Sequence, residues 1–433
     1  MSKNIKWLFT EIDKWVKNGV IDSVQGETIK NQYPVPDQGI SWGKIIFSTI
    51  GAIIFGLGVI LLFAYNWEKM SKYAKLGVVF SSLLTAHGFG LYLGRDSSSH
   101  KAAGQGLHVL GTMLFGAGIW LVAQIYHIDE HFPNAFVAWS LGALALAWAV
   151  PSISQGIIAS ILMVFWNGFE VFEFRNPNHF ASPIILSCIL PLAWKLRSRA
   201  LLGTGICSFI LALCFTCSRV DDDLILPVIF FWSCAFIASG IILKDHPEFS
   251  QFFPIFSFFG NLPYMAVLYA MSFKSSGKYL FHIDFQSFEI ILYFTIPALT
   301  AAVLWFIAFK RIISKDYMSD YSSLGHLATP AVLIFFILQA VFGGMKGWPG
   351  AAFYNLIYIF HCIMFICHGC KTINIRQTAV GCLLFSLIVL TRYVDLFESL
   401  IVRAIIFFFI GTGIFVVGNF YSGAKKKAEG GME

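Results

Sequence analysis

Long apolar segments follow one another from residue 43 to residue 421, and most of them approach the length of about 20 residues that a helix needs to cross a membrane. Inside a bilayer the backbone must satisfy its own hydrogen bonds, so such segments are expected to be helices. The composition agrees, because 57% of the residues are hydrophobic and 12% are charged, whereas about a quarter of a soluble domain is charged. The chain is therefore expected to be an all-α, polytopic membrane protein, and a disordered, collagenous or disulfide-rich secreted chain is excluded.

Fourteen segments are predicted to span the membrane, and the expected number of spans lies between 12 and 14. Three of the segments are short for a span. They are residues 43–65, 76–93, 104–126, 134–150, 156–172, 181–194, 200–217, 224–243, 252–273, 290–309, 324–342, 351–369, 378–391 and 400–421. The short segments are 156–172, 181–194 and 378–391. We therefore expect a helical bundle of about 14 transmembrane helices in which short loops join the spans.

Lys and Arg are distributed unequally between the two sides of this predicted bundle. With the N-terminus inside, 20 of the 30 basic residues fall on the inner side. Positively charged loops generally stay in the cytoplasm, so both termini are predicted to be cytoplasmic. The predicted regions are a cytoplasmic hairpin (1–42), a first transmembrane region (43–150), the remaining bundle (151–421) and a basic tail (422–433).

The N-terminal region is predicted to be an amphipathic helical hairpin. Apolar residues recur at helical spacing between Ser2 and Asn18, and Gly19 follows as a C-terminal cap. Asp22 can cap a second helix, with Gln25 three residues later completing a capping box. So small a unit buries little by itself, so we expect it to pack on membrane lipids, on another copy of the chain or on a protein partner.

Three short stretches resemble the bacterial family of predicted membrane proteins called domain of unknown function 2157. They are Trp15–Ile21 (WVKNGVI), Ala64–Trp67 (AYNW) and Gln124–Ile128 (QIYHI), within about the first 150 residues. Thr391–Phe397 (TRYVDLF) also looks like a stretch near the end of related multi-span families. The resemblance implies a multi-pass protein of the bacterial cytoplasmic (inner) membrane, and it brings no established activity.

Ionisable residues near the ends of the predicted spans are the candidate site residues, because polar groups in lipid are costly and usually functional. The group at the outer end of span 104–126 comprises Gln124, Tyr126, His127, Asp129 and Glu130, with His131 next to it. An imidazole beside two carboxylates can relay protons or hold a cation or a sugar, whereas solvated charges at a helix end are the structural alternative. Glu170 is either a buried proton carrier or a residue at the membrane edge.

A second group lies near the C-terminus and comprises Arg392, Tyr393 and Asp395, with Arg403 just inside the last span. Either arginine can pair with Asp395 as a structural clamp, or an unpaired arginine can bind an anionic headgroup or substrate. Isolated histidines within the spans, by contrast, are expected to be packing residues. These are His87, His108, His326, His361 and His368.

No catalytic motif accompanies these residues. The sequence has no Gly-Lys-Ser or Gly-Lys-Thr phosphate loop, no HExxH and no Gly-x-Ser-x-Gly elbow. Two CxxC pairs, Cys214 with Cys217 and Cys367 with Cys370, fall at opposite sides of the predicted membrane and cannot share one zinc ion. We expect no metal, no cofactor and no nucleic-acid partner.

Three functions are compatible with this pattern. The first is transport of a small or lipid-linked solute through a polar cavity. That cavity would be lined by some of Gln124, Tyr126, Glu170, Asn261, Gln339 and Arg392. The second is an enzyme that acts on a lipid-linked substrate at the outer leaflet, with Asp129 and Glu130 beside His127. The third is a scaffold or sensor that docks through the hairpin. Many spans with short loops favour transport, and the absence of motifs leans against an enzyme.

Overall fold

The computed structural model describes residues 3–32, 54, 70–95, 101–128, 131–273, 283, 285–314, 321–342, 348–396 and 400–430. The described chain forms helices throughout, which confirms the predicted all-α class. It divides into two compact units, Met1–Val78 and Val79–Glu433, and each is described by itself.

Most of the described part of the first unit is the predicted hairpin, α1 (Lys3–Lys17) and α2 (Ser23–Gln32). Gly19 has a φ of 70°, which only glycine adopts freely, and it terminates α1 as predicted. The Asp22 backbone N–H donates to Gln25 Oε1 at 3.1 Å, which confirms the reach-back bond of the capping box. Lys30 Nζ lies 2.5 Å from Asp13 Oδ1 and ties the two helices together.

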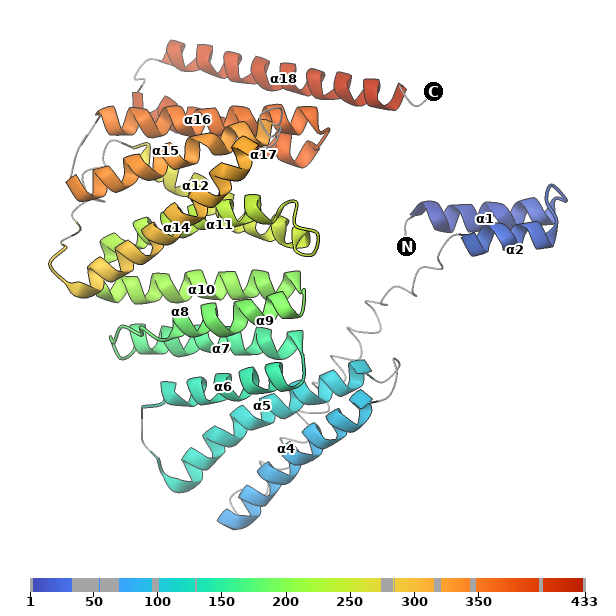
Figure 1. The fold of residues 1–433 in the computed structure, drawn as a ribbon, viewed down its shortest axis with the longest axis vertical. Coiled ribbons are helices and arrows are strands. Elements are labelled where there is room, and N and C mark those ends of the chain that lie inside the picture. Colours follow the sequence, from blue (N-terminus) through green and yellow to red (C-terminus); the bar gives the residue numbers. More distant parts are fainter. Residues whose placement is uncertain are drawn as a thin grey trace. The chain divides into compact units, whose positions relative to one another are not determined.

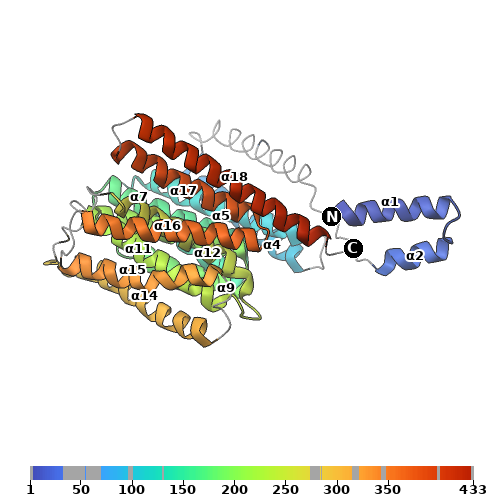
Figure 2. The ribbon, with the colours of Figure 1, turned by 90° about the horizontal axis from the view of Figure 1, so that it is seen from above.

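The second unit is built from apolar helices, several of which lie one above another in Figure 1. They are α4 (Lys72–Arg95), which starts in the first unit, α5 (Lys101–Tyr126), α6 (Pro133–Ala149), α7 (Ile153–Phe172), α8 (Ala181–Ile184), α9 (Leu190–Lys195), α10 (Arg199–Val220), α11 (Ile225–Leu243), α12 (Phe253–Met271), α14 (Phe288–Ser314), α15 (Tyr321–Phe342), α16 (Trp348–Lys371), α17 (Ile375–Leu396) and α18 (Leu400–Gly430). Figure 2 shows α16, α17 and α18 side by side.

Ten of these helical segments are long and apolar enough to cross a membrane, and three more are shorter apolar helices. Each predicted span from 76–93 onward coincides with one of them, whereas the predicted span 43–65 lies outside the described residues. Two segments that looked short from the sequence are full-length helices, because α7 begins at Ile153 and has 20 residues and α17 has 22. The fold is therefore a multi-pass helical membrane bundle.

The segment 181–194 is the irregular one. Between α8 and α9 the chain makes one π-helical turn, Ile185–Ile189. Pro191 follows directly, and a proline has no N–H to donate and its ring crowds the carbonyl of residue 187, so the local widening relieves that contact.

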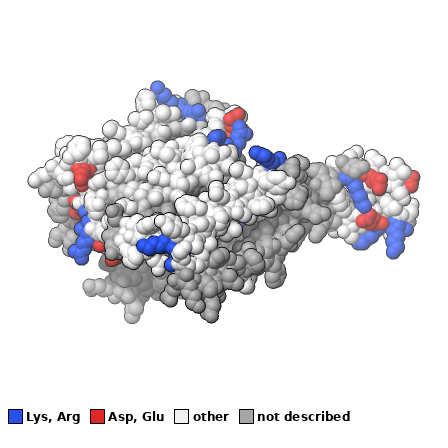
Figure 3. Space-filling view, turned by 90° about the horizontal axis from the view of Figure 1, so that it is seen from below, with Lys and Arg blue, Asp and Glu red and all other residues white. Residues whose placement is uncertain are grey.

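Helix α11 is at the centre of the hydrophobic core of the second unit. It packs against α12 and α14, and 67% of the residues in its most apolar 18-residue stretch are buried. Phe230 stacks on Phe336 of α15 with ring centres 4.2 Å apart, and Trp305 Nε1 of α14 donates to the Cys234 carbonyl at 3.0 Å. Much of the surface drawn in Figure 3 is uncharged, and its charged side chains lie in small groups.

We predict that Gly260→Ala destabilises the bundle. A Cβ at Gly260 of α12 would lie 2.8 Å from the backbone nitrogen of Ile237 on α11, and a backbone atom moves only if the helix moves. Overpacking of this kind costs about 1–3 kcal/mol. Thermal unfolding in detergent measures the effect, with Gly203→Ala as the control because its Cβ would meet side-chain atoms no closer than 3.8 Å. Equal unfolding midpoints for the two variants would contradict the close packing of α11 on α12.

Candidate functional site

The end of α5 places the first predicted group of site residues. His127 has a φ of 52°, and the Ile128 N–H donates to the Ala123 carbonyl at 2.9 Å, which is the bond of a Schellman helix end. The backbone at His127 therefore terminates α5, while Gln124, Tyr126 and His127 present exposed side chains there. Asp129 and Glu130 lie outside the described residues.

His131 forms an ion-pair contact that reaches across to α7. Its Nε2 lies 2.7 Å from Glu170 Oε1, and the side chains are 34% and 8% exposed. Trp166 Nε1, one turn earlier on α7, donates to the same carboxylate oxygen at 3.3 Å. The second oxygen, Glu170 Oε2, is buried without a hydrogen-bond partner among the described residues. Glu170 is therefore a buried carboxylate, and the partner that it meets is the imidazole of His131.

Aromatic rings enclose this pair. The His131 ring lies 3.9 Å from the Phe174 ring, centre to centre, in an edge-to-face arrangement. Phe169 of α7 packs on Phe132 at 5.2 Å and on Phe136 of α6 at 5.1 Å. Edge-to-face and offset rings of this kind hold one another in fixed positions. The carboxylate thus lies in an apolar, ring-lined site, and the half-exposed imidazole forms its border.

The other side of α7 is fastened to α10 by a buried amide. Asn167 Nδ2 donates to the Ala212 carbonyl at 2.7 Å, and the Thr216 hydroxyl donates to the Asn178 carbonyl at 2.9 Å. Asn178 in turn caps the next helix, because its Oδ1 accepts from the Ala181 N–H at 3.3 Å. These bonds fix the last turn of α7, which carries Glu170, and the chain that follows it.

His179, in the segment that follows α7, makes a second histidine–carboxylate contact. Its Nδ1 lies 2.9 Å from the Tyr293 hydroxyl and its Nε2 lies 3.7 Å from Glu289 Oε1, both on α14. A second histidine–carboxylate contact thus joins the segment after α7 to α14, although here both side chains are exposed by more than a third. Such an exposed pair is a weaker interaction than the buried one.

Arg392 on α17 joins three helices. Its Nη2 donates to the Ser272 carbonyl at 2.5 Å and to the Ser272 hydroxyl at 2.7 Å, and its Nε donates to Asn355 Oδ1 of α16 at 3.1 Å. The guanidinium also lies 4.5 Å from the centre of the Phe273 ring. Ser272 ends α12, where the helix dipole favours a cation. Arg392 therefore acts as a structural clamp, and Ser272 and Asn355 are the partners that the structure describes.

The remaining members of the second predicted group are Tyr393 and Asp395, with Arg403 close to them in the sequence. Tyr393 and Asp395 lie on α17, but their side chains, like that of Arg403 on α18, lie outside the described part of the structure. The pairing of Arg392 with Asp395 stays a prediction, as do Tyr393 and Asp395 as site residues.

The two predicted groups do not meet in the described structure. Helices α5 and α17 lie at opposite sides of the stack, with α10 and α11 between them (Figure 1). Two further candidates bond elsewhere: Asn261 donates to the Ser257 carbonyl on its own helix at 2.8 Å, and Gln339 accepts from the Tyr354 hydroxyl at 2.8 Å. Any site at His131 and Glu170 is therefore separate from Arg392.

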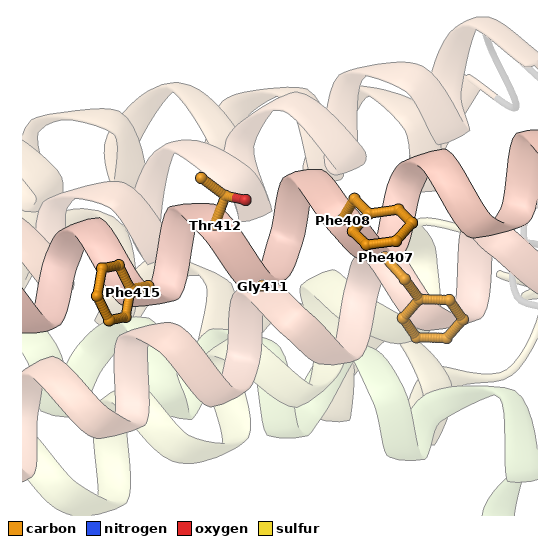
Figure 4. Close-up of a pocket in the computed structure, with 5 residues that line it drawn as sticks. All are labelled: Phe407, Phe408, Gly411, Thr412 and Phe415. Atoms are coloured by element: carbon orange, nitrogen blue, oxygen red, sulfur yellow. The ribbon is translucent and has the colours of Figure 1, made fainter.

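The surface hollow in Figure 4 offers no passage through the bundle. Phe407, Phe408, Gly411, Thr412 and Phe415 line it, and all five lie on α18. Three of these residues are phenylalanines and one is a glycine, so the hollow is mostly apolar. Phe408 and Phe415 are 77% and 70% exposed. A hollow walled by one helix and facing outward suits a lipid chain rather than a polar solute.

His361, which was expected to be a packing residue, lies beside Tyr264 in the interior. His361 Nε2 and the Tyr264 hydroxyl are buried without hydrogen-bond partners among the described residues, and their rings lie 5.3 Å apart. His87 and His108, also expected to be isolated, contact each other. No local signal in the sequence pairs residues that lie on different spans.

We predict that Arg392→Lys lowers the stability of the bundle. A lysine ammonium is a point charge and cannot bond Ser272 and Asn355 at once from a planar group. Losing charge-assisted hydrogen bonds of this kind costs about 1–3 kcal/mol. The midpoint of thermal unfolding in detergent is the measurement, and Arg376→Lys, at an exposed position of the same helix, is the control. If both variants unfold like the unmodified chain, the clamp contributes nothing.

Comparison with known proteins agrees with the resemblance in the N-terminal part of the chain. Residues 13–155 match the family model described as predicted membrane protein (DUF2157). Trp15–Ile21, Ala64–Trp67 and Gln124–Ile128 all lie inside this match, so the resemblance is confirmed. No curated protein and no solved structure was found to match the chain. The protein is thus a multi-pass membrane protein whose residues 13–155 are similar to the DUF2157 family of predicted membrane proteins.

Proposed function

We propose that the protein translocates a small or lipid-linked polar solute and that His131 and Glu170 receive it. The observation that carries the proposal is Glu170 Oε2, a buried carboxylate oxygen without a hydrogen-bond partner among the described residues. Buried polar atoms are normally hydrogen-bonded, and an intramembrane carboxylate is costly to keep. A hydroxyl or ammonium group of a solute would supply the missing donor.

The surroundings of the pair narrow the class of solute. Trp166 donates to the carboxylate, Phe174 packs on the His131 ring, and Phe169 packs on the neighbouring Phe132. A carboxylate near aromatic side chains suits a sugar or a cationic headgroup. Aromatic side chains bind the apolar face of a sugar, and they also bind cations. His131, 34% exposed, provides the accessible edge.

The predicted orientation of the chain in the membrane gives the side from which a solute would approach His131. With the N-terminus in the cytoplasm, as the basic residues favour, the C-terminal end of α7 faces outward. In a bacterial inner membrane the solute would then meet His131 from the outer face. Gln124, Tyr126, His127, Asp129 and Glu130 belong to the same outer segment and are proposed as its rim. Arg392, Tyr393 and Asp395 would contact a solute only at a second site, away from His131 and Glu170.

An enzyme that acts on a lipid-linked substrate is the second candidate. The observation that favours it is the 2.7 Å contact, because a carboxylate that holds an imidazole in one orientation is half of a general-base arrangement. This function requires a product that differs chemically from the substrate, so mass spectrometry of the recovered solute separates it from translocation.

The hairpin is proposed as a docking element under either function. Trp7, Val20 and Val24 are 61–71% exposed, which is costly for apolar side chains in water. The surface could pack on membrane lipids, a second copy or a protein partner. Loss of function on deletion of residues 2–38 would support this role.

We predict that Glu170→Gln abolishes solute binding. The substitution keeps the size of the side chain and removes its charge. Choline and glucose serve as probes of the two solute classes, and either one, if bound, raises the thermal midpoint of the full chain in detergent. We expect at least one probe to raise the midpoint of the unmodified chain and to fail with Glu170→Gln. Uptake of that probe into proteoliposomes should fall by about tenfold or more, equivalent to about 1.4 kcal/mol.

The matched control is Glu173→Gln, three residues later and exposed. It should bind and transport like the unmodified chain. If Glu170→Gln does so too, the carboxylate is not part of a solute site. If neither probe shifts the midpoint, the proposed solute classes are wrong.

A further inference from the structure

We propose that His87 and His108 form a proton-binding site within the membrane, in which two imidazoles share one hydrogen and take up one further proton as a pair. This inference is independent of the proposed solute site, because it concerns α4 and α5 and involves neither His131 nor Glu170.

The geometry of the pair is that of a hydrogen bond between rings. His87 Nδ1 on α4 lies 3.2 Å from His108 Nδ1 on α5. The ring centres are 5.5 Å apart and the ring planes are inclined by 28°. His108 is 3% exposed and His87 is half-buried. Two like atoms at this distance attract only if one carries a hydrogen and the other offers a lone pair.

Glycines on both helices make this approach possible. A Cβ at Gly90 of α4 would lie 2.9 Å from the His108 ring, and a Cβ at Gly111 of α5 would lie 2.6 Å from the His87 ring. Each helix thus carries a histidine followed three residues later by a glycine that accommodates the opposite ring. Gly104 brings the backbones together as well, since its Cβ would meet the Gly90 carbonyl oxygen at 2.8 Å. The reciprocal arrangement marks the histidine contact as a built feature of the helix pair.

The proton balance follows from imidazole chemistry. In the neutral pair, one ring carries its hydrogen on Nδ1 and donates it, and the other carries its hydrogen on Nε2 and accepts through a bare Nδ1. An added proton binds the bare Nε2 of the donor ring, which gives an imidazolium and leaves the bond between the rings intact as a stronger, charge-assisted one. The shared hydrogen can then cross to the second ring, which releases a proton from its own Nε2. A second added proton would break the bond and place two cations side by side.

The neighbouring groups are polar but uncharged. The Thr112 hydroxyl, one turn after His108, donates to Gln155 Oε1 of α7 at 2.7 Å, and Trp139 Nε1 of α6 donates to the Thr112 carbonyl at 2.7 Å. Gln155 Nε2 is buried and has no hydrogen-bond partner among the described residues. Thr112 lies one turn from His108, so the groups of Gln155 and Trp139 reach the α5 turn next to the histidine.

The charged groups nearest to the pair along its own helices are Lys101, seven residues before His108, and Arg95, eight residues after His87. α6 contains no titratable residue, and the one in α7 is Glu170, in its last turn. On α4 they are Lys72, Lys75, Tyr73, Tyr92 and Arg95, and on α5 they are Lys101 and Tyr126 at its ends. Among the described residues no carboxylate, Lys or Arg hydrogen-bonds or ion-pairs with either ring. An added proton would therefore be stabilised by the second imidazole.

The test is solid-state NMR on the full chain in lipid bilayers, with the ring nitrogens of its 11 histidines labelled with ¹⁵N. At neutral pH we expect a correlation between one protonated and one bare Nδ1, consistent with the 3.2 Å separation. On acidification we expect one imidazolium per pair while the correlation persists, and the second ring to protonate only at a clearly lower pH. His87→Gln assigns the signals and His127→Gln leaves them unchanged.

Two matched glycine variants test the geometry without removing a ring. Gly111→Ala should abolish the correlation, and Gly106→Ala on the same helix, where a Cβ would meet nothing within 4 Å, should preserve it. The unmodified chain alone decides the proposal: two rings that lack the correlation at every pH, or that protonate together at one midpoint, overturn it. Loss of solute binding in Glu170→Gln with an intact histidine correlation would separate the two sites.

Discussion

The hydrocarbon core of a membrane offers the backbone no water, and the described helices follow from this single constraint. Each helix satisfies its own N–H and C=O groups, so neighbouring helices are held by packing and by a few side-chain donors. Trp139, Asn167 and Trp305 each reach a carbonyl of another helix, at 2.7–3.0 Å. A carbonyl oxygen has two lone pairs, so it accepts this second bond without losing its helical one.

The same constraint explains how far the sequence predicts the fold. Apolar length alone locates the spans, because helix is the conformation that lipid permits. Local chemistry locates Gly19 and the Asp22–Gln25 cap, since both partners lie within one turn. The π-turn before α9 was not predicted, although Pro191 was its visible cause. The start of α7 was also not predicted. The helix begins at Ile153, three residues before the predicted span, because its first turn contains polar residues that the apolar pattern does not include.

The candidate site was harder to predict, because its contacts join distant residues. His131 was considered beside Asp129 and Glu130, but the carboxylate that the structure places against it is Glu170, 39 residues away on α7. Arg392 was weighed against nearby Asp395, yet it bonds Ser272, 120 residues away. The sequence predicts only that ionisable residues lie near the ends of the spans. Which ones meet depends on helix packing, and therefore on glycines such as Gly90 and Gly111.

The packed core also limits where a solute could travel. Phe230, Tyr264 and Phe336 fill the space around α11 with stacked rings, so a polar solute crossing there would have to displace the best-packed part of the bundle. The α5–α7 interface is different in kind. Thr112 and Gln155 pair in its interior, and Glu170 lies at one end of α7. Polar side chains in lipid are costly, so the Thr112–Gln155 pair marks the α5–α7 interface as the place where a polar group would enter the bundle with the least repacking.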